Sequence, residues 1–159
     1  MAFRMSRDHA DFVAHGGTEW DDGAFVNVKK IKIFHDWAGI TLVQFDYIDG
    51  TGAIVSGLDH GRVPVEGARA EFWLRDDEYI TIVTAFGGYC VRKIEFITNK
   101  RTFDFGVEAA DPEYFARREA REALTYELPA TYGDMGRPIV GFHGKSGIHY
   151  LHELGVYFR

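Results

Sequence analysis

From Gly16 onward, short runs of alternating hydrophobic and polar residues are separated by glycine and aspartate. Lys30 and Lys32 alternate with Ile31 and Ile33, which predicts a strand with one solvated and one buried face. Repeated runs of this kind predict an all-β domain of the sandwich, barrel or prism type. Further strands are expected at Ile40 to Ile48, Glu71 to Leu74, Tyr79 to Ala85, Tyr89 to Thr98, Ile139 to Phe142 and Tyr150 to Phe158.

Two segments depart from this β pattern. The first, residues 1–15, is polar and irregular, which predicts a loose N-terminal arm. The second begins at Asp111, a capping residue that is followed by proline and an acidic first turn. The rest of this segment is rich in helix formers. We therefore expect one short helix, at about 111–125, inserted into a single β domain that spans residues 16–159.

Composition narrows the class of protein. The 159 residues carry a net charge of −6, which disfavours nucleic-acid binding because phosphate neutralisation needs a basic surface. The first fifteen residues resemble no signal peptide, and no apolar run approaches the roughly 20 residues of a membrane helix. We therefore expect a cytoplasmic protein that does not bind membranes. The single cysteine, Cys90, excludes an internal disulfide and is interpreted as a small inward-facing core residue.

Candidate catalytic and metal motifs fail on spacing. His143, His149 and His152 match no ligand pattern, and no cysteine joins them. The segment 141–146 (GFHGKS) has two residues between its glycines, where a phosphate loop needs four. Residues 144–147 (GKSG) do not form a nucleophile elbow, and no acid and base pair is recognisable for glycosidase chemistry. We expect no metal, no cofactor and no catalysis.

An ordered set of short motifs resembles the jacalin-related lectin family of plants. The motifs succeed one another from Gly16 to the end of the chain, interrupted by the expected helix. They are Gly16 to Gly23 (GGTEWDDG), Glu78 to Thr81 (EYIT), Thr98 to Thr102 (TNKRT), Ile139 to Gly147 (IVGFHGKSG) and Gly155 to Tyr157 (GVY). Within the first motif, we interpret Trp20 as packing under the loop and Asp21 and Asp22 as tying down turn amides.

This resemblance implies a β-prism I fold. Such a fold has three four-stranded Greek-key sheets around a pseudo-threefold axis. It also implies a sugar site at one end of the prism, where backbone amides and an aspartate of the last hairpin hold sugar hydroxyls. Glycine suits such a site because it allows close approach of the backbone. Transferred to this chain, the carbohydrate-binding positions are Gly16, Gly17, Gly88, Tyr89, Gly147, His149, Tyr150, Leu151 and His152.

The chain departs from the family at the aspartate, whose position falls on His152. One extra residue also stands between Gly147 and Leu151. A neutral imidazole has one acceptor nitrogen and cannot copy the paired acceptors of a carboxylate. Glu153 replaces the aspartate only if the extra residue shifts the strand register. Otherwise the loop repositions, another group substitutes, or the site is weakened or lost.

Three functions stay open at this point. The first is binding of mannose- or glucose-type glycans and glycoproteins, since nothing in the sequence shows the chain cleavage at Gly17 that accompanies galactose preference in the family. The second is a protein-interaction module of the kind that binds glucosidases, and the third is a diverged scaffold without glycan function. The resemblance also implies a homodimer. Counting strand directions places the inserted helix at the sugar end.

Overall fold

The structure, a computed structural model, describes residues 3–5, 17–87, 90–107 and 130–159. The predicted helix at 111–125 and the predicted site positions Gly16, Gly88 and Tyr89 lie outside these residues. In the described segments no helix is long and apolar enough to cross a membrane.

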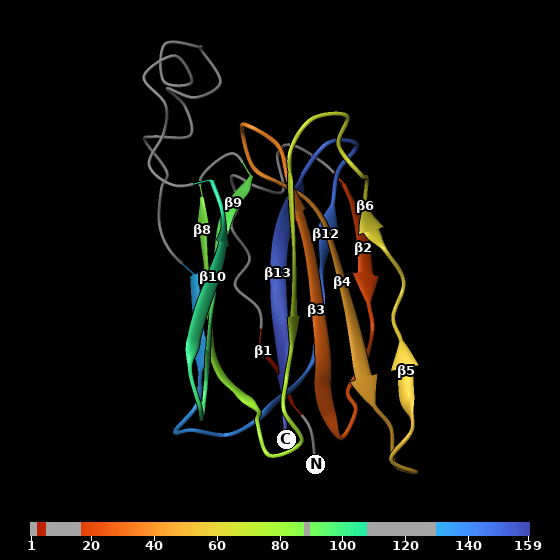
Figure 1. Ribbon diagram of the computed structural model, residues 1–159, viewed down its shortest axis with the longest axis vertical. Coiled ribbons are helices and arrows are strands. Elements are labelled where there is room, and N and C mark those ends of the chain that lie inside the picture. Colours follow the sequence, from red (N-terminus) through yellow and green to blue (C-terminus); the bar gives the residue numbers. More distant parts are fainter. Residues whose placement is uncertain (1–2, 6–16, 88–89, 108–129) are drawn as a thin grey trace.

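Strands and turns make up the described part of the chain (Figure 1). Each strand predicted from the alternation overlaps an observed one, so the all-β prediction is confirmed. The strands are β1 (Phe3–Met5), β2 (Thr18–Asp21), β3 (Asn27–His35), β4 (Ile40–Ile48), β5 (Ile54–Ser56), β6 (His60–Gly61), β7 (Ala68–Trp73), β8 (Ile80–Gly87), β9 (Val91–Thr98), β10 (Thr102–Gly106), β11 (Ala130–Gly133), β12 (Ile139–Ser146) and β13 (Leu151–Phe158).

Antiparallel pairing joins these strands into two sheets rather than the three that the resemblance predicted. One has eight strands, in the order β1-β13-β12-β8-β9-β10, with β11 on β8 and β2 on β12. The other has five, in the order β5-β4-β3-β7, with β6 also on β4. The larger sheet is continuous only because Ile139 of β12 pairs with Ile80 of β8. On either side of that single pair lie two groups of four strands.

One strand lies in the predicted N-terminal arm. Phe3–Met5 forms β1 and pairs with the last strand, from Val156 to Phe158. These three residues are therefore held by the sheet, whereas the rest of the predicted arm lies outside the described residues.

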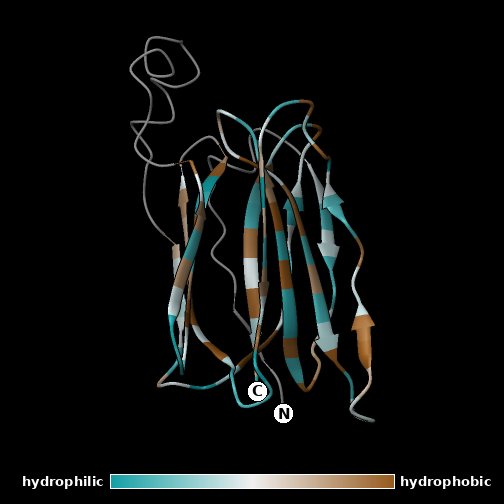
Figure 2. Ribbon diagram, in the orientation of Figure 1, coloured by the Kyte–Doolittle hydropathy of each residue, from teal (hydrophilic) through white to brown (hydrophobic). Residues whose placement is uncertain are grey.

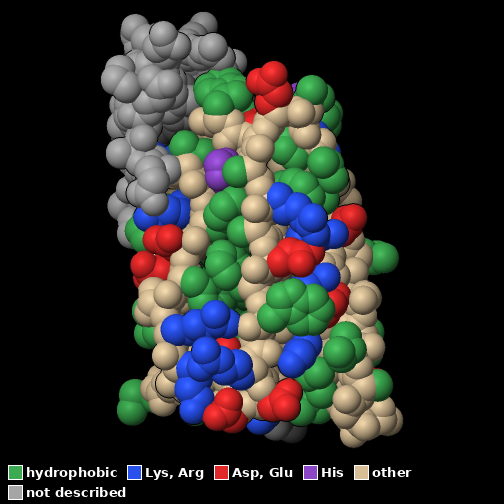
Figure 3. All heavy atoms as spheres, viewed as in Figure 1, with side chains coloured by type: hydrophobic (Ala, Val, Ile, Leu, Met, Phe, Trp, Pro, Cys, Tyr) green, Lys and Arg blue, Asp and Glu red, His purple; other side chains and the backbone are tan. Residues whose placement is uncertain are grey.

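The inner faces of the sheets share one hydrophobic core. Phe142 lies in it, with its ring stacked on Phe45 of the smaller sheet at a centroid distance of 4.0 Å and edge-on to Phe96 at 6.4 Å. Figure 2 shows hydrophobic and hydrophilic residues alternating along β3, as a strand with one buried face requires. Its neighbour β4 is buried on both faces over nearly its whole length. In the face seen in Figure 3, acidic and basic side chains are interspersed, so this face shows no block of one sign.

The strands define two ends of the molecule (Figure 1). We call one the hairpin end, which carries the turn at 36–39 and the β12–β13 hairpin turn at 147–150. The other, the base, carries the turns at 49–53, 75–79 and 99–101 and the end of β13. Strand β10 ends, and β11 begins, toward the hairpin end. The predicted position of the inserted helix at the sugar end agrees with these two strand ends, but the helix itself lies outside the described residues and stays a prediction.

Candidate functional site

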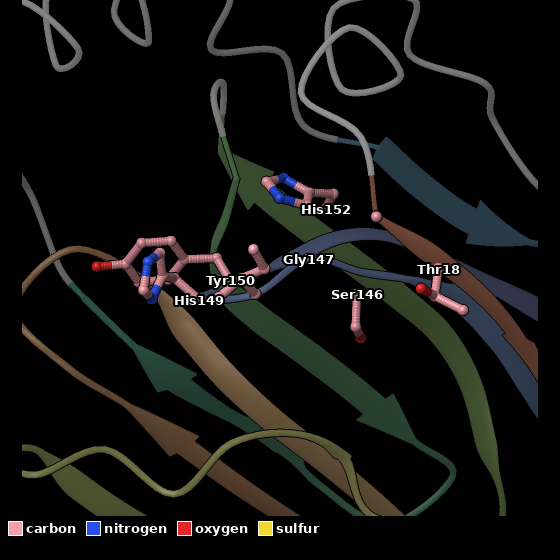
Figure 4. A pocket seen from close by; sticks show the side chains of 8 residues that line it. Thr18, Ser146, Gly147, His149, Tyr150 and His152 are labelled. Atoms are coloured by element: carbon pink, nitrogen blue, oxygen red, sulfur yellow. The ribbon is translucent and has the colours of Figure 1, made fainter.

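A pocket of about 590 Å³ lies at the hairpin end (Figure 4). It brings together five predicted site residues, and three that the sequence did not suggest also line it. Leu151 is the exception among the described predictions, because its side chain is fully buried in the core. The described lining residues are Gly17, Thr18, Ser146, Gly147, Ile148, His149, Tyr150 and His152.

Gly17 forms one side of the pocket floor. Its φ of +119° lies in the region that favours glycine, and an added Cβ would lie 3.1 Å from the carbonyl oxygen of Ser146. The next residue, Thr18, pairs with Ser146 across β2 and β12. The start of β2 therefore lies directly beside the end of β12. Because of this pairing, Thr18 and Ser146 line the pocket together with the predicted Gly17.

Gly147 begins the turn that forms the other side of the pocket. Its N–H donates a hydrogen bond to the carbonyl oxygen of Tyr150 at 2.8 Å, which closes the hairpin turn. The resemblance implied that amides of this hairpin hold sugar hydroxyls, but here the Gly147 amide is already engaged. An added Cβ would approach Nε2 of His152 to 2.5 Å, so the imidazole packs directly on the glycine backbone.

His152 occupies a bulge in β13. Lys145 pairs with Glu153, whereas the next residue, Ser146, pairs with Leu151, so His152 is the extra residue between the two pairs. Glu153 does not line the main pocket but a separate small cavity, so it does not take the place of the missing aspartate. The buried imidazole of His152 lines the main pocket instead.

The lining offers hydrogen-bonding groups of both kinds. Thr18 and Ser146 contribute hydroxyls, and His149 and His152 contribute imidazoles. The hydroxyl of Ser146 is itself oriented by Trp20, whose indole N–H donates to its Oγ at 3.0 Å. Such a set can bind a polyhydroxylated ligand by exchanging several hydrogen bonds. Across the described residues, no three His, Cys, Asp or Glu side chains gather as a metal site would require.

Asp36 supports one wall of the pocket, and sequence reasoning missed it. Its Oδ2 accepts a hydrogen bond from the Tyr150 hydroxyl at 2.9 Å and one from Arg62 at 3.2 Å. Its Oδ1 accepts hydrogen bonds from the backbone N–H groups of Ala38 and Gly39. Burial, together with the hydrogen bond to this carboxylate, raises the pKa of the Tyr150 phenol. Only the Asp36-to-Gly39 turn pattern could have drawn attention to this residue.

The WDD motif is structural. Trp20 stacks on His60 with ring centroids 3.7 Å apart. Asp21 accepts a 2.8 Å hydrogen bond from the backbone N–H of Gly23, as predicted. Asp22 differs from the prediction because it binds side chains: the Tyr47 hydroxyl and Nε2 of His60, each at 2.7 Å. Burial, and then the Asp22 carboxylate, raises the pKa of Tyr47 well above its usual value.

Two other sequence candidates are core residues. His143 is buried, and its ring lies so close to Gly155 that an added Cβ there would come within 2.2 Å of it. It therefore lies apart from the two pocket histidines. Cys90 is also buried, and burial raises the pKa of its thiol to about 12, which confirms its interpretation as a core residue.

The EYIT and TNKRT motifs meet at the base, where hydrogen bonds and an ion pair at Glu78 join two turns, 75–79 and 99–101. Glu78 accepts hydrogen bonds from the Thr98 hydroxyl at 2.7 Å, from Nε of Arg101 at 2.9 Å and from the Arg75 backbone at 3.0 Å. Its side chain is fully buried. Burial alone would raise its pKa, but the hydrogen bonds and the Arg101 charge more than offset this and lower the pKa of Glu78 to about 2.

A bulged hairpin and a glycine at the entrance of β2 thus place a polar pocket at one end of an all-β domain. Comparison with known protein families identifies the class. The sequence model of the jacalin-like lectin domain matches residues 11–157, and the chain therefore belongs to the jacalin-like lectin family. The family prediction made from the motifs is confirmed.

Individual related proteins are found in Arabidopsis thaliana. Jacalin-related lectin 39 is 91% identical over 117 residues, which are 67% of this chain and 98% of that protein. PYK10-binding protein 1 is 35% identical over 156 residues, 93% of this chain, and myrosinase-binding protein 2 is 35% identical over 151 residues. This chain spans 46% of the former and 20% of the latter, so these relatives contain further sequence.

Solved structures show the same fold. Single-chain recombinant jacalin matches 99% of this chain and 93% of its own with a TM-score of 0.72 and 22% identity. The galactose-binding lectin from Champedak, solved with Gal(β)1,3-GalNAc, matches 89% of this chain and 98% of its own with a TM-score of 0.71 and 25% identity. The fold is therefore the jacalin-like β-prism.

Proposed function

We propose that this chain is a non-catalytic lectin that binds mannose- or glucose-type glycans in the hairpin-end pocket. The observation that carries the proposal is the assembly of Gly17 and the 147–152 hairpin into one polar pocket. These are the two segments on which the family resemblance locates the sugar. Membership of a lectin family and the structural match to a galactose-binding lectin support a carbohydrate ligand.

The preference for mannose or glucose rests on the chain around Gly17. In the family, galactose preference accompanies a chain cleavage that frees a glycine at this position. Nothing in the sequence shows such a cleavage here, where Gly16 and Gly17 follow one another. In the uncleaved chain no terminal ammonium forms at Gly17, and the hydroxyls of Thr18 and Ser146 with the two imidazoles would supply the polar contacts.

A glycan array is the direct test, with two glycine variants as probe and control. Gly147→Ala introduces a Cβ that meets the His152 ring at 2.5 Å, whereas Gly50→Ala, at the base, meets nothing within 4 Å. We expect mannose-terminated glycans to bind the wild type and Gly50→Ala, and to lose most binding with Gly147→Ala. Galactose-only binding would overturn the preference. No binding at all would favour a diverged scaffold without glycan function.

A second candidate function is binding to a glucosidase-type protein. It is favoured by the relatives named as PYK10-binding and myrosinase-binding proteins. A pull-down with a purified plant β-glucosidase, carried out with and without free mannose, separates the two. Competition by mannose supports recognition of glycans on that enzyme, and binding that mannose does not reduce supports recognition of its polypeptide.

A further inference from the structure

The turn of Asp36 to Gly39 belongs to the smaller sheet, yet it contacts the last hairpin of the larger one. It connects β3 to β4, and Asp36 N–H donates to the Gly39 carbonyl at 3.1 Å, so the turn is closed on itself. The carboxylate of Asp36 then takes up two more backbone N–H groups through Oδ1. Its Oδ2 is directed to Tyr150 and Arg62, outside its own turn.

Two further contacts, made by Arg62 and Gly39, hold Tyr150 against this turn. The guanidinium of Arg62 lies 5.8 Å from the Tyr150 ring centre while it also binds Asp36. Gly39 lies so close beneath that an added Cβ would be 3.4 Å from Cδ1 of Tyr150 and 2.7 Å from Sγ of Cys90. Tyr150 is therefore held by Asp36 at its hydroxyl, by Arg62 on its ring face and by Gly39 along its ring edge. Figure 4 shows its hydroxyl turned away from Thr18 and Ser146.

These contacts affect the pocket because Tyr150 also closes the hairpin turn that forms one side of it. The Tyr150 carbonyl accepts a hydrogen bond from the Gly147 N–H, and the His152 ring packs on the backbone of Gly147. A movement of Tyr150 would therefore shift the wall formed by residues 147–150. An anionic acceptor makes the phenol hydrogen bond stronger than a neutral one would be.

The turn that holds Tyr150 also carries an exposed aromatic side chain. Trp37 directly follows Asp36 and is 54% exposed, and Ile148, on the clamped hairpin, is 87% exposed. Hydrophobic side chains are also visible at the upper end of the face in Figure 3. A large exposed aromatic residue gains free energy when a flat apolar group covers it.

We propose that the Asp36–Gly39 turn supports the wall of the sugar site formed by residues 147–150 and extends it: Asp36 is a positioning residue that fixes Tyr150, and Trp37 contacts an aromatic group attached to the sugar. The ligand class is then a glycoside with an aromatic aglycone, rather than the free hexose alone. This rests on the proposed function, because it adds a contact to the same pocket.

Two glycosides and three variants test it. The probes are methyl α-mannoside and 4-nitrophenyl α-mannoside, measured by isothermal titration calorimetry. The variants are Asp36→Asn, Trp37→Ala and the control Asp49→Asn, a turn aspartate at the base whose Oδ1 likewise accepts backbone N–H groups, those of Thr51 and Ala53. All must keep the wild-type melting temperature to within a few degrees.

We expect Asp36→Asn to weaken both glycosides by about three- to tenfold, because the charged acceptor for Tyr150 is lost. Trp37→Ala should weaken the nitrophenyl glycoside alone, and Asp49→Asn should weaken neither. If Asp36→Asn behaves like Asp49→Asn, the positioning role is wrong. If Trp37→Ala weakens both probes equally, or neither, the aromatic contact is wrong.

Failure of the proposed function gives a different result. If the wild type binds neither glycoside, the ligand class is wrong, and amide hydrogen exchange in residues 147–150 then tests the clamp without a ligand. Faster exchange in Asp36→Asn but not in Asp49→Asn would retain the positioning role. Equal exchange in the two variants would overturn it.

Discussion

The two ends of this molecule use their buried polar groups in opposite ways. At the base, the carboxylate of Glu78 is surrounded by donors from Thr98, Arg101 and the Arg75 backbone, and it joins the turns at 75–79 and 99–101. At the hairpin end, glycine backbone and imidazoles line an open pocket, and the buried carboxylate of Asp36 supports its wall from behind, through Tyr150. A group whose hydrogen bonds are all internal stabilises the fold, whereas a pocket needs polar groups that a ligand can reach.

The comparison also separates the family motifs by role. EYIT and TNKRT form the network around Glu78 at the base. The residues that shape the pocket lie in the glycine-containing motifs 16–23 and 139–147 and in the hairpin that follows them. A chain can therefore retain the motifs that specify the fold while its pocket changes, as the His152 bulge illustrates.

Disrupting the hydrogen-bond network around Glu78, which we call the base lock, should have the largest effect on stability. Glu78→Gln removes the charge that Arg101 and Thr98 share, and we expect the free energy of unfolding to fall by about 2–4 kcal/mol. Glu71→Gln is the matched control, since Glu71 pairs with Arg69 on the surface and should cost less than about 1 kcal/mol. Denaturant unfolding measures both. If glycan affinity falls with stability in Glu78→Gln, the two ends are not independent.

Changing the pocket should alter affinity without comparable loss of stability. His152→Asp places a carboxylate where the family has one, and we expect mannoside binding to tighten by about 1–3 kcal/mol. Glu153→Asp is the control, because residue 153 lines a different cavity. Calorimetry compares the two. Tight binding by the wild type that His152→Asp leaves unchanged would show that a carboxylate has no part in recognition by this loop.

Acid should weaken the base lock selectively. The pKa of Glu78 is lowered to about 2 in the folded protein, from an ordinary value of 4.5. Its stabilisation is therefore complete above pH 4.5 and is lost as the pH falls from 4.5 toward 2. Because Arg101 is 38% exposed, solvent screening reduces the effect to about 1–2 kcal/mol. Denaturant midpoints measured across this range should show a component that Glu78→Gln lacks, and parallel curves for the two proteins would contradict the assignment.

The smallest effect concerns Cys90, at the hairpin end. Burial raises the pKa of its thiol to about 12, so the thiolate is scarce at neutral pH. We expect almost no reaction with a thiol-specific reagent at pH 7 under native conditions, and stoichiometric reaction in denaturant. Rapid native labelling would mean that the hairpin end opens far more readily than the base.

The sequence predicts the long strands well because each buries one face. Lys30 to Ile33 shows the alternation that β3 requires. The short strands β6 and β11 carry too few residues for a pattern, and they form because β4 and β8 offer them an edge. Gly17 and Gly147 are predictable from their motifs. Asp36 is not, because 114 positions separate it from Tyr150 in the chain.

The course of β13 determines how the domain can be tethered. It starts at the pocket and ends at the base, where it pairs with β1 (Figure 1). A fusion or surface attachment through Arg159 therefore leaves the pocket facing away from the anchor. Copies joined in this way present their pockets outward together, so that a weak single site gains avidity from effective concentration once the spacing of a multivalent target matches the linker.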